Sequence, residues 1–178
     1  VVHIEAKDGA MLPHLAIFHA QHPTASQILT GVKDGPNGVH AINRLLCKRE
    51  GLALTLCGRP DLPVGTPVVL TNNLPEYGLD NGTLGKVLDT KRVVFLSGAG
   101  TTHTLDATPS MLAVLMPAYA LTIHKAQGSQ WAHVALAVGR SRLLDRSLLY
   151  TAATRAMEGL LILGTKADIA AAIAAPPR

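Results

Sequence analysis

The sequence predicts an α/β fold in which a parallel sheet is interrupted by a β-rich insertion. Near both ends of the 178-residue chain, short apolar runs alternate with helical patterns, which favours a doubly wound parallel sheet with right-handed crossovers. Between these parts, from about residue 52, short β-rich runs are separated by turn-forming sequences, as is typical of a small barrel or meander. With 48% apolar residues, the chain can form one core and a small inserted module.

The N-terminal part contains one strand–loop–helix unit, and the insertion follows it. Residues 27–30 form a short apolar run that predicts a buried strand. The turn-rich segment 31–38 then leads into apolar residues at helical spacing. The β-rich runs of the insertion predict further strands at 66–71, 82–88 and 92–96.

After Pro117 the alternation of strands and helices returns. The pattern predicts strands at 118–123, 134–138 and 160–163, a helix at 147–157 and a terminal Ala-rich helix from Lys166. In parallel sheets of this kind, ligands bind at the carboxyl ends of the strands. We therefore expect the polar residues that follow the strands to carry the function.

The charge of the chain is compatible with a phosphate-bearing partner. The formal net charge is +4, and lysines and arginines that neutralise phosphates release condensed counterions on binding. Proteins that bind no nucleic acid are often equally basic, so charge alone leaves both interpretations open. The chain has only one Trp, three Tyr and two Phe, which argues against extensive stacking of bases on aromatic side chains.

The cysteines and histidines do not predict a metal site. Cys47 and Cys57 lie ten residues apart without a CxxC pair, which favours reduced thiols in the cytoplasm. His19 and His22 form an HxxH pattern within a polar segment that contains a proline, and a solvated loop is the favoured interpretation there.

No segment of the sequence predicts a membrane span. The longest apolar stretch, residues 111–121, is interrupted by Pro117 and is too short to cross a bilayer. No secretory signal precedes the fold, so a cytoplasmic protein is expected. The chain begins at Val1 and enters an apolar segment directly, which suggests that an upstream portion exists.

A polar turn follows the strand predicted at 118–123 and is the first candidate site. The chain reads AYALTIHKAQG at 118–128, so Thr122, His124, Lys125 and Gln127 converge near one strand end. If this turn opens a helix, its free backbone N–H groups suit phosphate oxygens. From these residues alone, a capped helix with solvated His and Lys side chains is equally plausible.

A single arginine is the second candidate. The chain reads LLYTAATRA at 148–156, and helical spacing places Arg155 near one face with Leu148 and Ala152. A guanidinium held there can stabilise charge on a transferring phosphoryl group, as an arginine finger does. In isolation, an ion pair with Glu158 is the better interpretation of this residue.

Together, the two segments resemble motifs V and VI of RecD-like superfamily 1 DNA helicases. Residues 27–46 resemble the motif IV strand and helix of the same family, Val64–Val87 resembles its inserted small β-barrel, and Gly164 closes the strand that follows motif VI. The resemblance covers roughly residues 25–165. It implies a C-terminal RecA-like motor lobe, a parallel sheet flanked by helices. The lobe is expected at residues 1–58 and 111–178, with the barrel inserted at 59–110.

The resemblance also implies roles for individual residues. DNA contacts are expected from one set of side chains in motif V: Thr122, His124, Lys125 and Gln127. ATP contacts are expected from a second set, in which Arg155 is the catalytic arginine: Gly128, Gln130, Arg155 and Lys33. The family usually has Glu where this chain has Gln130, and an amide accepts more weakly from a ribose hydroxyl than a carboxylate does, which puts the sugar contact in doubt.

Two elements of an ATPase are missing from the sequence. It contains no GxxxxGKS/T phosphate loop, and the most similar segment, residues 82–87, lacks the spacing and the hydroxyl. No predicted strand ends in paired acidic residues for Mg²⁺. We therefore expect ATP and Mg²⁺ to bind mainly to a missing N-terminal lobe, and this chain alone to bind no cofactor and to hydrolyse no ATP.

Three functions remain open on the sequence. The leading one is half of an ATP-driven DNA helicase, of the exodeoxyribonuclease V alpha or conjugative-relaxase type. Its partners would be single-stranded DNA, the N-terminal lobe, and subunits of repair, recombination or conjugation assemblies. It requires the turn near His124 and the guanidinium of Arg155 to face one cleft at one end of the sheet. The second is a non-catalytic helicase-like module that binds DNA or protein. The third is an unrelated small α/β enzyme. A dinucleotide site at residues 98–100 would fit it, but this turn lacks a third glycine, and a strand is expected directly after it.

Overall fold

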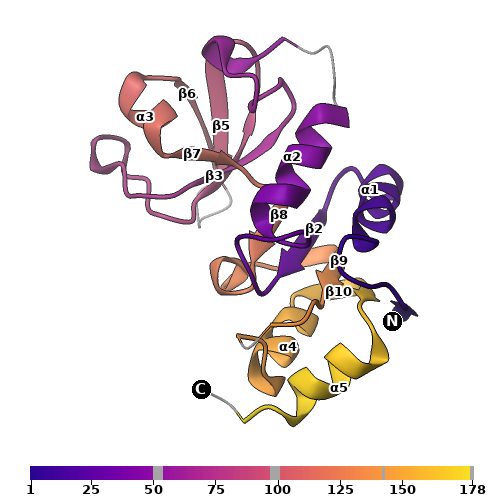
Figure 1. Cartoon of the computed structure of the whole chain (residues 1–178). Helices are drawn as coiled ribbons and strands as arrows, with labels where there is room; N and C mark the ends of the chain where they lie inside the picture. Colours follow the sequence, from indigo (N-terminus) through magenta and orange to yellow (C-terminus); the bar gives the residue numbers. More distant parts are fainter. Residues whose placement is uncertain (50–53, 97–100, 142, 177–178) are drawn as a thin grey trace. The chain divides into compact units, whose positions relative to one another are not determined.

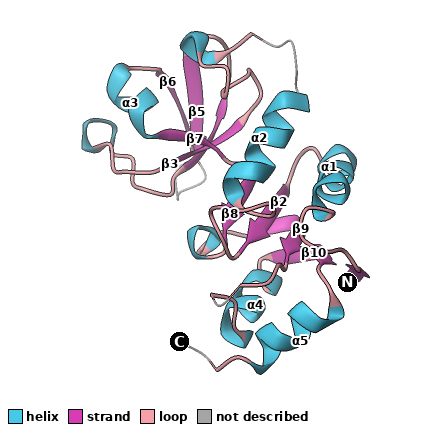
Figure 2. Ribbon diagram, viewed as in Figure 1, coloured by secondary structure: helices cyan, strands magenta, loops and turns pink. Residues whose placement is uncertain are grey.

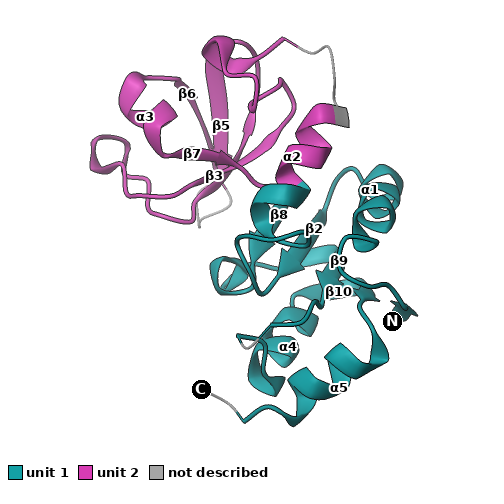
Figure 3. Cartoon of the chain, viewed as in Figure 1, with its two compact units in different colours: residues 1–42, 120–178 teal, residues 43–119 magenta. Residues whose placement is uncertain are grey.

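The computed structural model describes residues 1–49, 54–96, 101–141 and 143–176. It divides the chain into two compact units, one formed by residues 1–42 and 120–178 and the other by residues 43–119 (Figure 3). The second unit is longer than the predicted insertion at 59–110. One reason is that side chains of α2 (Val39–Arg49) form hydrogen bonds with other residues of the second unit. Asn43 Nδ2 donates to Pro117 O at 2.8 Å, and Cys47 Sγ donates to Asp61 O at 3.4 Å.

The first unit is built on a five-stranded parallel sheet, which confirms the predicted fold class (Figures 1 and 2). Its strands, in spatial order, are β1 (Val2–Ile4), β10 (Ala156–Leu163), β9 (Trp131–Ala137), β2 (Ser26–Thr30) and β8 (Ala120–Thr122). Neighbouring strands pair in parallel throughout. The strands β2, β8, β9 and β10 were expected from the sequence, whereas β1 was not.

Helices flank both faces of this sheet. The helices of the first unit are α1 (Met11–Gln21), α4 (Arg146–Ala153), α5 (Lys166–Ala174) and the start of α2 (Val39–Arg49). The crossover through α1 leads from β1 towards β2, and the crossover through α4 leads from β9 back to β10, in the opposite direction. Right-handed crossovers therefore place α1 and α4 on opposite faces, as Figure 1 shows.

Several predicted boundaries are wrong, and these errors bear on the site. The polar turn after β8 was expected to open a helix, but it forms only a 3-10 turn, η3 (His124–Ala126), before the chain extends into β9. The helix expected at 147–157 ends at Ala153, because β10 begins at Ala156 and pairs with Trp131 of β9. His19 lies within α1 and His22 caps its end, so this HxxH segment is helical and not a loop.

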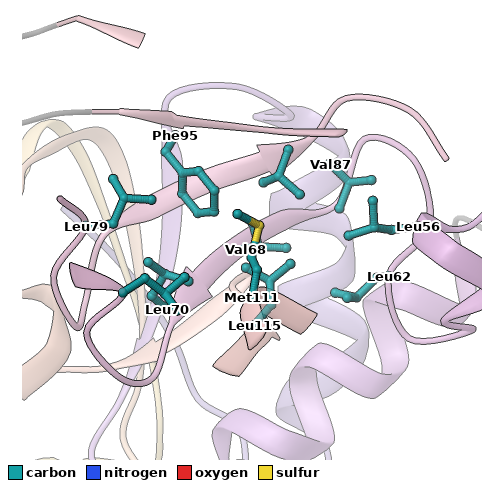
Figure 4. Close-up of a cluster of buried hydrophobic side chains, with 11 residues drawn as sticks. Leu56, Leu62, Val68, Leu70, Leu79, Val87, Phe95, Met111 and Leu115 are labelled. Atoms are coloured by element: carbon teal, nitrogen blue, oxygen red, sulfur yellow. The ribbon is translucent and has the colours of Figure 1, made fainter. Parts of the chain in front are cut away.

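The second unit contains an antiparallel five-stranded sheet. Its spatial order is β6 (Thr102–Asp106), β5 (Arg92–Leu96), β4 (Leu84–Val87), β3 (Pro67–Leu70) and β7 (Leu115–Pro117), accompanied by α3 (Pro109–Val114) and the short turns η1 (Leu56–Gly58) and η2 (Pro75–Tyr77). Phe95, Met111 and Leu70 are fully buried in its apolar core (Figure 4). The three predicted strands of the insertion are confirmed. Closure of this sheet into a barrel stays a prediction.

Two further observations concern the described part of the chain. No helix in it combines the length and apolar character that crossing a bilayer requires. It also contains no group of three or more His, Cys, Asp or Glu side chains placed to bind a metal ion. The glycines at 98 and 100, on which the dinucleotide interpretation depends, lie outside the described residues.

Candidate functional site

The site begins where β8 ends, at the carboxyl edge of the parallel sheet. Thr122 pairs with Thr30 of β2, which pairs in turn with Ala137 of β9. Ile123 N donates to Thr30 O at 3.1 Å and so fixes the first residue of the turn to the neighbouring strand. The hydroxyl of Thr122 accepts a hydrogen bond from Lys125 N at 3.3 Å. The threonine therefore orients the start of η3.

Lys125 and Lys33 form a cationic pair at this edge. Burial lowers the pKa of Lys125, and the nearby charge of Lys33 lowers it further. Both effects arise because a protonated amine loses hydration and meets a like charge. An anion bound between the two ammonium groups would relieve both penalties, which makes this pair suited to a phosphate oxygen.

After η3, the chain runs back towards the amino edge of the sheet. Gly128 adopts a φ of +86°, a left-handed conformation that glycine adopts without strain. Ser129 and the exposed Gln130 then lead into β9, where Trp131 N donates to Arg155 O at 2.9 Å. The turn therefore joins the two edges of the sheet.

Arg155 is held beside this returning segment. Its Nε donates to Thr151 O at 3.1 Å, Nη1 to Ser129 O at 3.3 Å and Nη2 to the Thr154 hydroxyl at 3.3 Å. The sequence favoured an ion pair with Glu158, but the Glu158 carboxylate lies 3.8 Å from His133 Nε2. The guanidinium has five N–H groups, of which these bonds to described residues use three. Two N–H groups remain for a further acceptor.

Burial of α4 explains how Arg155 is positioned. Asp145 caps this helix by accepting a hydrogen bond from Leu148 N at 2.8 Å. Leu148 and Ala152 are 8% and 0% exposed, so the helix packs firmly through the face that the sequence predicted. Arg155 itself lies two residues beyond the helix, in the turn before β10, and its backbone N donates to Ala152 O at 3.1 Å.

The candidate residues thus form two groups at opposite edges. Thr122 is level with Thr30 of β2 and, through it, with Ala137 of β9. Trp131 of β9 is level with Ala156, the residue after Arg155. Ala137 comes six residues after Trp131, which is about 20 Å along the strand at ~3.3 Å per residue. The expectation of one cleft at one end of the sheet is therefore wrong for Thr122 and Lys125, and a helicase lobe would have to use two edges joined by this turn in place of one cleft. The turn does bring Gly128 and Gln130 to the edge where Arg155 lies.

The remaining predicted residues divide between these groups. Lys33, which the family resemblance assigns to ATP, lies near Lys125 at the carboxyl edge. His124 and Gln127 are exposed on and just after η3, between the two edges. The individual roles of all these residues stay predictions. The carbonyl groups of Ser129 and Thr151, which hold Arg155, were not expected, because a backbone acceptor leaves no trace in a sequence.

Comparisons with known proteins agree with the resemblance seen in the sequence. Residues 117–163 match the UvrD-like helicase C-terminal domain family. The RecD subunit of the RecBCD enzyme from Mycobacterium tuberculosis is 37% identical over 154 residues, which are 83% of this chain and 26% of that subunit. The ATP-dependent RecD2 DNA helicase from Deinococcus radiodurans is 33% identical over 169 residues, 91% of this chain and 23% of that protein. The chain thus spans about a quarter of these relatives.

A solved structure shares the fold. The crystal structure of a Pif1 helicase from Bacteroides in complex with ADP-AlF3 and single-stranded DNA aligns with 86% of this chain and 44% of that chain, with a TM-score of 0.55 and 19% sequence identity. This similarity supports a RecA-like lobe for the first unit.

Proposed function

Because the chain belongs to the RecD-like superfamily 1 helicases, as a C-terminal RecA-like lobe, we propose that it is one half of an ATP-driven DNA translocase. The observation that carries this proposal is the contact between Arg155 Nη1 and Ser129 O. It attaches the arginine to the same turn that begins at Thr122 and Lys125. One segment therefore connects a nucleotide-facing edge with a DNA-facing edge.

At the amino edge, the chain supplies groups for a nucleotide that an N-terminal lobe holds with Mg²⁺. The two remaining N–H groups of Arg155 are available to bind an oxygen of the γ-phosphate. When ATP is bound, its hydrolysis places growing negative charge on the phosphoryl oxygens, and a fixed guanidinium stabilises that charge. The amide oxygen of Gln130 can accept a hydrogen bond from the ribose. Gly128, without a side chain, allows the backbone to approach the nucleotide.

At the carboxyl edge, the chain contacts the backbone of single-stranded DNA. The hydroxyl of Thr122 and the ammonium of Lys125 suit phosphate oxygens, and the exposed His124 and Gln127 add hydrogen-bonding groups. Closure of the two lobes on ATP would pull on Arg155 and Ser129. The turn would then shift the DNA contacts at its other end, and a cycle of hydrolysis would move the strand.

The test is the ATPase activity of the full-length protein that carries this chain. Arg155→Ala should lower DNA-stimulated ATP hydrolysis by ~10³-fold or more, the range found for arginine fingers, while single-stranded DNA binding persists. Arg146→Ala is a matched control, because this arginine is exposed at the start of the same helix. If Arg155→Ala leaves ATP hydrolysis at the control level, the motor proposal fails and a non-catalytic binding module remains.

A further inference from the structure

The parallel sheet has a regular feature at its carboxyl edge that no single motif contains. One row of register partners crosses all five strands, through Ile4, Leu163, Ala137, Thr30 and Thr122. Three residues beyond each member of this row lies a basic residue, in the same spatial order: Lys7, Lys166, Arg140, Lys33 and Lys125. Lys and Arg make up only 16 of the 178 residues, so composition alone does not explain five in one row.

At the opposite edge, the comparable positions are those three residues before the starts of four strands. Three residues before β10, β9, β2 and β8 lie Ala153, Gly128, Pro23 and Pro117, and none of these has a charged side chain. The basic residues therefore distinguish the two ends of the same strands. Because neighbouring strands are ~4.8 Å apart, the row extends over about 19 Å, four strand spacings.

Three of the segments that carry the row, those after β1, β2 and β9, are fixed to one another. Asn37 Nδ2, after β2, donates to Asp8 Oδ1, after β1, at 2.5 Å, and Gly9 N donates to Asn37 Oδ1 at 3.1 Å. A Cβ added at Gly139, after β9, would lie 2.7 Å from Asp8 Oδ1 and 3.2 Å from Asn37 Nδ2, so this loop also packs tightly against the other two. Lys7, Lys33 and Arg140 thus extend from preorganised loops.

Within the described residues, several nearby carboxylates have uncharged hydrogen-bond partners. Asp8 accepts from the Asn37 amide, Asp145 accepts from Leu148 N at the start of α4, and Asp168 accepts from the Thr165 hydroxyl at the start of α5. Asp34 lies 3.9 Å from His40 Nε2. Lys7, Lys33, Arg140 and Lys166 are exposed.

A cavity of about 160 Å³ lies within the row, between the loops that follow β2 and β9. Arg140, Asp34 and Thr30 are among its lining residues. From β2 the chain continues to β8 on one side, and from β9 to β10 on the other, so these neighbouring strands form the switch point at which α/β sheets bind ligands.

We propose that this row binds the phosphodiester backbone of single-stranded DNA as one continuous band. In this proposal the DNA contacts the ends of all five strands and not only the end of β8. The inference rests on the proposed DNA contact and extends it to Lys7, Arg140 and Lys166. It also places Lys33 on the DNA and not on ATP. A row of cations without aromatic neighbours suits a repeating polyanion, because successive phosphates present the same charge whatever the base sequence.

The test is the salt dependence of binding of the 178-residue chain to a fluorescent oligothymidylate of about 12 nucleotides. The band variant combines Lys7→Gln, Arg140→Gln and Lys166→Gln. The matched control combines Arg44→Gln, Lys48→Gln and Lys86→Gln, which remove the same charge from exposed positions of the second unit. Each lost phosphate contact lowers the magnitude of the negative slope of log K against log salt by ~0.7, so this magnitude should fall by about 2 in the band variant and stay unchanged in the control.

Two further variants separate the possible outcomes. A loss of DNA affinity can also come from a damaged fold, whereas a gain in affinity cannot. Glu5→Gln removes an exposed negative charge next to β1 and should therefore strengthen DNA binding. Lys125→Gln should lower the magnitude of the slope by ~0.7 if the proposed contact at β8 exists.

The band is excluded if its variant retains the wild-type slope, or if both triple variants lose slope equally, since net charge alone would then explain binding. If Lys125→Gln still lowers the magnitude of the slope in the first case, the proposed function survives without the band. If the wild-type chain binds no oligothymidylate, both fail. Loss of polyglutamate binding by the band variant, with the DNA slope unchanged, would assign the row to an acidic protein and overturn the inference.

Discussion

At the amino edge of the sheet one guanidinium is fixed by three hydrogen bonds, whereas at the carboxyl edge five cations lie on the segments that follow the strands. Arg155 has two backbone carbonyls and a hydroxyl as partners, which leaves it little freedom to rotate. Lys33, by contrast, is exposed and near another cation. The first arrangement suits a single directed contact with a reacting group, and the second suits many weak, salt-dependent contacts that a moving strand can exchange.

The largest effect is expected from a change in the turn that joins the two edges of the sheet. Gly128→Val places a β-branched residue at a φ of +86°, which costs about 1–2 kcal/mol and should redirect the turn. In the full-length protein, stimulation of ATP hydrolysis by DNA should fall at least tenfold. Gly82→Val is the matched control, because Gly82 has a φ of +92° and, like Gly128, no atom within 4 Å of an added Cβ. Equal loss of DNA stimulation in both variants would show that the turn carries no coupling.

The amino edge depends on the packing of α4. Asp145→Ala removes the hydrogen bond to Leu148 N and should lower the free energy of unfolding by about 1 kcal/mol. Since α4 positions Arg155, the ATPase rate of the full-length protein should also fall several-fold. Thr165→Ala removes the corresponding cap from α5, where the hydroxyl accepts from Asp168 N at 3.0 Å. This control should lose comparable stability, measured by urea unfolding, and keep its ATPase rate.

At the carboxyl edge, stability and binding should change in opposite directions. Lys125→Gln removes a partly buried charge that lies near Lys33, so the melting temperature should stay equal or rise. Affinity for single-stranded DNA should fall a few-fold, because one phosphate contact is lost. A variant that melts lower and binds DNA normally would contradict the assignment of Lys125.

Stability and DNA binding should also change in opposite directions as pH rises. The pKa of Lys125 is lowered from 10.5 by burial and by Lys33, so the folded chain releases this proton before the unfolded chain does. As pH rises between the lowered pKa and 10.5, the fold gains stability and DNA binding weakens. Lys125→Arg should remove this part of the pH dependence of binding, because arginine stays charged. Titrations that are identical for both proteins would exclude the effect.

Much of the fold can be predicted from the sequence because local patterns determine it. The apolar runs at β2, β8, β9 and β10 were sufficient to predict a parallel sheet. β1 was missed because it has only three residues and Val2 is 60% exposed. α1 was missed because it contains Pro13, has no side-chain N-cap and has no acidic residue in its first turn, so the usual start signals are absent.

The candidate site was predictable only as a set of residues. The resemblance identified Thr122, Lys125 and Arg155, but not that a long turn separates them across the sheet. Strand order and register depend on tertiary packing, so no local pattern shows that Lys7 and Arg140 share a row with Lys125. For the same reason, the contact between Arg155 and Ser129 O could not be inferred.

The central claim is that one turn couples the two edges, and coupling can be measured directly. In the full-length protein, the affinity for single-stranded DNA would be compared with and without a non-hydrolysable ATP analogue. Linked sites typically change each other's affinity by about 5- to 150-fold. We predict a change in this range for the wild type and almost none for Arg155→Ala. If Arg155→Ala binds the analogue and still shows the full change, the connection through Arg155 and Ser129 is contradicted.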